Sequence, residues 1–173
     1  MPVYMAKNLE RDFTLMNKYI IFSLLILISF SCKKDKTNQQ NLDFFDPVFV
    51  DFTVNMDLPD AAELKFPNGF MYSANGYKGI IIYNTGFPGA DQYVAFDRAC
   101  PYKTDSICSI VTMESNNLFY VCGKTVNTKF VPCCGSKFAA QNGGVVSGAA
   151  NRGLRQYYVY QFGSQLRVTN TPI

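Results

Sequence analysis

The chain has 173 residues, 48% of them hydrophobic, which is enough for one domain with a core and marginal for two. It contains six cysteines and no histidine, and its formal net charge is +3. The missing histidine excludes Ser-His-Asp and Cys-His nucleophiles, HExxH zinc sites and any histidine base. The small net charge, without a long basic run, does not indicate nucleic-acid binding.

Residues 1–31 have the pattern of a signal peptide. Lys18 precedes the apolar run Ile20–Phe30, which is eleven residues long and too short to cross a bilayer. The run ends close to Cys32, where polar sequence begins. This pattern indicates export to an oxidising compartment, where cysteines tend to pair.

The Ser31-Cys32 junction resembles a bacterial lipobox, and the charged residues after it resemble the start of Bacteroidetes-type lipoproteins. The resemblance implies cleavage before Cys32 and lipidation of Cys32. The expected location is the cell envelope, at the outer membrane, with the facing left open. A plain signal peptide or an anchor helix with an incidental cysteine is the alternative. Met16 would start a more compact signal peptide, so residues 1–15 are open to being an over-called start.

Residues 32–43 are typical of a flexible polar tether after the lipidated cysteine, and residues 44–173 are typical of one all-β domain. One helical turn is expected near 61–65, and hairpins are expected around 114–117 and 163–164. The β-branched run Ile80–Ile82 is expected in the core. Short strands between turns predict an antiparallel sandwich or barrel. The strands are expected over 50–56, 70–72, 79–84, 92–97, 108–113, 118–122, 128–131, 154–162 and 165–169.

Two cysteine loops resemble those of the Rieske iron–sulfur domain. The first is Cys100-Pro101-Tyr102, and the second is Val131-Pro132-Cys133-Cys134-Gly135-Ser136-Lys137-Phe138. The glycine-rich run 143–150 resembles the cover loop of that family, and the likeness extends over about residues 70–169. It implies a Rieske-like antiparallel β-sandwich or barrel with the two cysteine loops at one end.

The resemblance also implies a degenerate cluster site. A Rieske cluster takes two cysteine and two histidine ligands. The four matching positions here are Cys100, Tyr102, Val131 and Cys134, so three of the four ligand types differ. Valine has no lone pair to give, and a neutral phenol is a poor ligand at pH 7. No cofactor and no metal are therefore expected, and a modified [2Fe–2S] cluster is the alternative.

By the same resemblance, Cys133 matches the disulfide cysteine of the second loop and Cys108 is its partner. Cys100 and Cys134 are then thiols on facing loops. Without a cluster between them, a second disulfide is expected in an oxidising compartment. Cys122 is left as a free thiol, on a strand away from the loops. A Cys108–Cys122 disulfide, a vicinal Cys133–Cys134 disulfide, and a zinc or iron–sulfur site of Cys100, Cys108, Cys122 and Cys134 remain alternatives.

Two weaker signals lie beside these loops. Asp97-Arg98 precedes Cys100 and could tune a thiol pKa, although an exposed ion pair is the simpler interpretation. Ser136 is expected to bond the backbone within its turn rather than a cluster sulfur.

The sequence offers no catalytic set, so the expected function is that of a lipid-anchored envelope protein with a binding or structural role. Its expected partners are the membrane, through Cys32, and an envelope protein, but not nucleic acid. Electron transfer or redox sensing, through an iron–sulfur cluster or a reducible Cys100–Cys134 pair, is the alternative. A third hypothesis places a ligand in a cleft lined by Tyr102, Val131 and Phe138.

Overall fold

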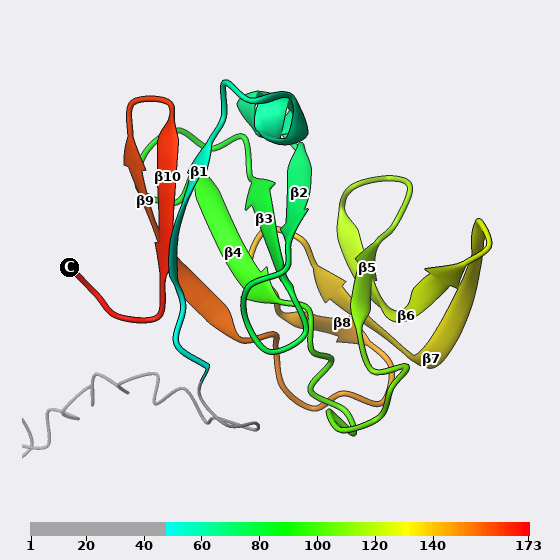
Figure 1. Cartoon of the computed structure of the whole chain (residues 1–173). Coiled ribbons are helices and arrows are strands. Elements are labelled where there is room, and N and C mark those ends of the chain that lie inside the picture. The colour runs from blue at the N-terminus through cyan, green and yellow to red at the C-terminus, as the bar shows by residue number, and fades with distance from the viewer. Residues whose placement is uncertain (1–47) are drawn as a thin grey trace, which may run out of the picture. The chain divides into compact units, whose positions relative to one another are not determined.

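The computed structural model describes residues 48–173. The predicted signal peptide, Cys32 and the tether lie outside the described residues. The described part is mostly β, with two antiparallel sheets and one short helix (Figure 1). A search of residues 48–173 finds no helix with the length and apolar character needed to cross a membrane.

The larger sheet has six strands in the order β1-β10-β9-β4-β3-β2, and every neighbouring pair is antiparallel. It curls as a half-barrel (Figure 1). The short helix, η1 (Pro59–Lys65), buries Ala61 and Leu64 against it. The strands are β1 (Asp51–Asn55), β2 (Phe70–Ser73), β3 (Ile80–Asn84), β4 (Tyr93–Asp97), β9 (Gln156–Phe162) and β10 (Gln165–Thr169).

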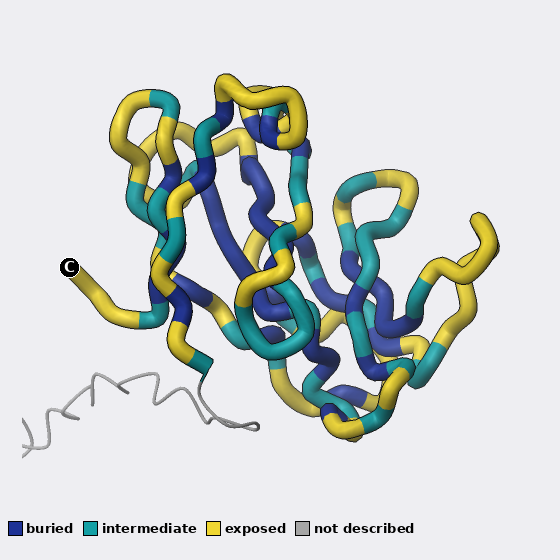
Figure 2. The backbone as a smooth tube through the Cα atoms, viewed as in Figure 1, coloured by how far each residue is buried: buried dark blue, intermediate teal, exposed yellow. Residues whose placement is uncertain are grey.

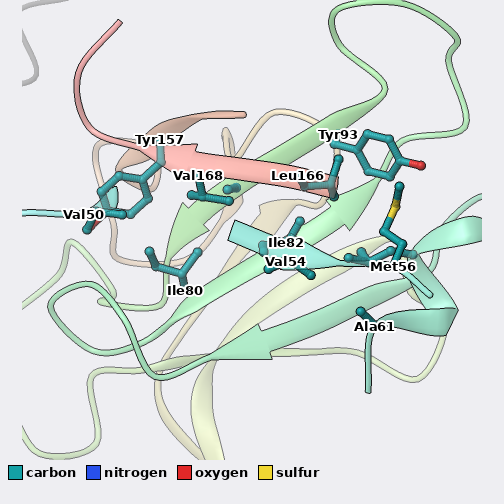
Figure 3. Packing of buried hydrophobic residues seen from close by; sticks show 12 residues of the cluster. Val50, Val54, Met56, Ala61, Ile80, Ile82, Tyr93, Tyr157, Leu166 and Val168 are labelled. Carbon is teal, nitrogen blue, oxygen red and sulfur yellow. The ribbon is translucent and has the colours of Figure 1, made fainter. Parts of the chain in front are cut away.

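The first core lies on one face of the larger sheet, as Figure 3 shows. It gathers residues from five of the six strands together with the helix, so one apolar cluster fixes the curl of the sheet. Its buried members are Val50, Val54, Met56, Ala61, Leu64, Ile80, Ile82, Tyr93, Ala95, Tyr157, Leu166 and Val168.

Strand β3 is buried on both faces. Side chains alternate across a strand, so Ile80 and Ile82 pack in the first core while Ile81 and Tyr83 pack in a second core. This explains the unbroken apolar run, and the prediction that Ile80–Ile82 lies in the core is confirmed, with all three side chains fully buried. Figure 2 shows both β3 and β4 as buried along their whole length.

The smaller sheet has four antiparallel strands in the order β5-β6-β7-β8. Its strands are β5 (Val111–Met113), β6 (Phe119–Val126), β7 (Lys129–Ala139) and β8 (Val145–Ser147). The second core joins this sheet to the larger one, because Phe96 of β4 packs with Tyr120 of β6 and Phe138 of β7. Tyr120 meets Phe96 edge-on with ring centroids 5.9 Å apart, and its hydroxyl donates to the Ala140 carbonyl at 3.0 Å.

Candidate functional site

The second cysteine loop leaves the hydrogen-bonded ladder between β6 and β7. Val121 pairs with Lys137, but Gly123 pairs with Pro132, so Cys122 alone on β6 stands opposite residues 133–136 of β7. Gly135 within this bulge has a φ of 68°, in the left-handed region that favours glycine. The bulge therefore places the second cysteine loop against Cys122.

The first cysteine loop follows β4 and is held by a lysine. Lys78 Nζ donates to the carbonyl oxygens of Thr104, of Ser106 at 2.7 Å and of Ser109 at 3.3 Å. The Ser109 hydroxyl in turn donates to the carbonyl of Cys100 at 3.2 Å. These bonds fix the backbone on which Cys100 lies and bring a partly buried cation to the loop.

Asp97 fastens the end of β4 just before Cys100. Its carboxylate is fully buried and accepts four hydrogen bonds, so the prediction of an exposed ion pair is wrong for this residue. A buried carboxylate needs this number of donors to offset its lost hydration. The donors are the backbone N–H groups of Tyr77 (2.7 Å), Lys78 (3.2 Å) and Ala99 (2.8 Å) and the hydroxyl of Tyr157 (2.8 Å).

A disulfide between Cys108 and Cys133 joins the two cysteine loops, with Cα atoms 5.4 Å apart. This is the first of the two predicted pairings, and it excludes the alternatives that pair Cys108 with Cys122 or Cys133 with Cys134. It also removes Cys108 from the predicted set of four metal-binding cysteines. The two loops are thus covalently linked whatever the remaining thiols do.

The three remaining cysteines of the described region, Cys100, Cys122 and Cys134, form a cluster that we call the thiol triad. Their Sγ atoms all lie within 4.8 Å of one another. Cys100 and Cys122 are fully buried, whereas Cys134 is half-buried. The expected position of Cys122 away from the loops is therefore wrong, because the β6–β7 bulge folds over it.

The second predicted disulfide is not formed in the structure. The Sγ atoms of Cys100 and Cys134 are 3.6 Å apart, which is contact distance for two free thiols and longer than a bond. The two sulfurs are in contact, and the pairing stays a prediction for the oxidised protein.

The thiols of Cys100 and Cys122 act on each other's protonation. Interaction with the Cys122 thiol lowers the pKa of Cys100 below its ordinary value, against the effect of burial. The same interaction, together with burial, raises the pKa of Cys122 far above the ordinary range. Cys100 is consequently the first of these two to become a thiolate as pH rises.

Ser136 supports the third thiol. Its Oγ lies 3.1 Å from Cys134 Sγ and accepts a hydrogen bond from the Ala150 backbone N–H at 2.9 Å. Gly148 lies directly over Ser136, and an added Cβ would be 2.4 Å from the Ser136 Cα. The prediction that Ser136 bonds the backbone within its own turn is therefore wrong, because its backbone partner belongs to the glycine-rich loop and its Oγ also contacts the Cys134 sulfur.

The residues at the Rieske-like ligand positions do not fit a Rieske cluster. Val131 is 43% exposed on β7, and Tyr102 is partly buried against the second core. The chain has no histidine, and the thiol triad offers three ligands converging on one point instead of two pairs around two irons. Phe138 is fully buried in the second core, unlike Val131, so these side chains do not line a common open cleft.

Comparison of the chain with protein-family models and with curated proteins finds no match.

Proposed function

We propose that the chain is a lipid-anchored envelope protein whose β domain is Rieske-like, has lost the histidine ligands of that family, and is cross-linked through its two cysteine loops. Its role is binding or structural, and it is not an enzyme. Cys32 supplies the membrane attachment, and an envelope protein is the expected partner.

The observation that carries this proposal is the pairing of the two loops. The Cys108–Cys133 disulfide links them, and Cys100 and Cys134 face each other at 3.6 Å beside that link. Two cross-links at this end of the domain would replace a metal cluster as the element that holds the loops together, since each contributes about 2–4 kcal/mol. The β6–β7 pairing and the second core give the loops a rigid base.

The test is the intact mass of the protein, exported to an oxidising compartment and measured with and without reductant, together with iron analysis and a visible spectrum. Each disulfide gains two hydrogens on reduction, so the two expected disulfides should give a mass gain of four hydrogens. Neither iron nor visible absorbance is expected. Iron with sulfide and a visible band would overturn the proposal. Cys32→Ser should move the protein from the membrane fraction to the soluble fraction, and an unchanged distribution would refute the anchor.

Thiol redox exchange is the second candidate function. It is favoured by the separation of Cys100 and Cys134 and by the half-buried position of Cys134, through which a partner disulfide could reach the pair. Oxidation would form one S–S bond and release two protons, while an external disulfide such as oxidised glutathione takes two electrons and becomes two thiols. Equilibration with glutathione separates the candidates, because structural disulfides have potentials below about −300 mV and resist that buffer.

A further inference from the structure

The thiol triad has the dimensions of a site for a single metal ion. An ion bonded to sulfur at about 2.3 Å requires sulfurs roughly 3.8–4.0 Å apart in tetrahedral or trigonal geometry. The three Sγ atoms lie within 4.8 Å of one another, and the Cys100–Cys134 pair is at 3.6 Å. Side-chain movements of less than about 1 Å would therefore bring all three sulfurs to bonding distance, within ordinary rotamer adjustment.

The donor set selects the class of ion. Three soft sulfur ligands favour Cu(I) or Zn²⁺ over hard cations. No fourth Cys, Asp or Glu side chain within residues 48–173 joins the group, and the chain has no histidine. Structural Zn²⁺ almost always takes four ligands, whereas monovalent copper is satisfied by three thiolates. We propose that Cys100, Cys122 and Cys134 of the reduced protein bind one Cu(I) ion.

The surroundings suit this ion. Cys134 is half-buried and gives a route from solvent, while the other two sulfurs are enclosed. Three thiolates around Cu(I) carry excess negative charge, and the Lys78 ammonium is near enough to Cys100 and Cys122 to interact with their charges. The Ser136 hydroxyl accepts from Ala150, so its own hydrogen is free to donate to the Cys134 sulfur once that thiol has lost its proton.

The binding step needs no oxidant. Three thiols give up their protons to solvent and Cu(I) takes their place, with no change of oxidation state. The inference goes beyond the proposed cross-linking role and applies to a different redox state of the same residues. A Cys100–Cys134 disulfide removes two of the three ligands, so this second cross-link and copper binding exclude each other, whereas the Cys108–Cys133 disulfide is compatible with copper binding.

The experiment is anaerobic titration of the purified, reduced full-length protein with a coloured Cu(I) chelate such as bicinchoninate. The wild type is expected to remove one Cu(I) per chain from the chelate. Cys122→Ala and Cys134→Ala should each weaken binding by more than about 100-fold, which exceeds the effect of losing an outer-shell partner. Thr125→Ser, an exposed change on the same strand as Cys122, is the matched control and should bind as the wild type does.

Each outcome is decisive. Failure of the wild type to take Cu(I), or undiminished uptake by both cysteine variants, overturns the proposal. Displacement of bound Cu(I) by one equivalent of Zn²⁺ overturns the choice of ion. Because Cys122→Ala changes the core, circular dichroism must show it folded, and Cys134→Ala, at a half-buried position, provides the second test. The intact mass of oxidised Cys122→Ala, compared with and without reductant, separately tests the Cys100–Cys134 disulfide, since this variant retains Cys100 and Cys134.

Discussion

Removing the Cys108–Cys133 disulfide should lower the free energy of unfolding by about 3.5 kcal/mol. The two cysteines are 25 residues apart in sequence, and the chain-entropy relation for a loop of about that length gives this value near 25 °C. The double variant Cys108→Ala/Cys133→Ala makes the change without leaving an unpaired thiol. Both side chains are only half-buried, so the loss of packing should be small beside the loss of the cross-link.

Urea unfolding of the wild type and the double variant, both without reductant, measures the difference. Both proteins contain the thiol triad, so its contribution cancels in the difference between their free energies of unfolding. Reductant should abolish the difference between the two proteins, because it opens the Cys108–Cys133 disulfide of the wild type and the expected Cys100–Cys134 disulfide of both. A difference below about 1 kcal/mol would refute the reasoning, because it would mean that the closed loop is already ordered in the unfolded chain or that the disulfide is not formed.

Two further predictions concern the packing around the site. Gly148→Ala should destabilise the fold by at least about 2 kcal/mol in urea unfolding, because its φ is +100° and the new Cβ meets the Ser136 backbone at 2.4 Å; Gly163→Ala, with positive φ but open space, should cost roughly half as much or less. Burial raises the pKa of Tyr120 and of Tyr157, so the folded protein keeps protons that the unfolded chain loses above about pH 10. Their contribution to stability is complete below that pH and falls as pH rises, by up to about 1.4 kcal/mol per pH unit for each tyrosine. Tyr157→Phe should flatten this decline in unfolding measured between about pH 8 and pH 11, and an unaltered slope would contradict it.

The β character of the domain could be predicted because its signals are local. The alternation in the strands, the Ile80–Ile82 run and the turns around 114–117 and 163–164 depend on a few neighbouring residues, and the structure has strands and hairpins there. β8 was missed because Val145–Ser147 has only three residues, all exposed, between glycines. Nothing but its pairing with β7 makes this segment a strand.

The position of Cys122 depended on pairing register, which local patterns do not carry. The hairpin turn at Asn127-Thr128 has positive φ at both residues and sets Gly123 opposite Pro132. Continuing that register by one step brings Cys122 level with Cys133. A turn assignment at Asn127 was thus the available signal, and without it a cysteine on a predicted strand gave no reason to join the loops.

The thiol triad lies beside two loops that a disulfide already joins, so loop closure alone does not explain why three thiols gather there. The Cys108–Cys133 disulfide joins the two loops, and the bonds of Lys78 hold the first of them. The loops are thus linked even while the thiol triad is reduced, and an odd number of thiols cannot all be satisfied by disulfides. One thiol must stay reduced after Cys100 and Cys134 pair, and it is Cys122, which is fully buried and has a higher pKa than Cys100. A purely structural cross-link has no need of that third sulfur, whereas a three-coordinate soft ion does. The copper titration of Cys122→Ala consequently asks the question on which the two uses of the site differ.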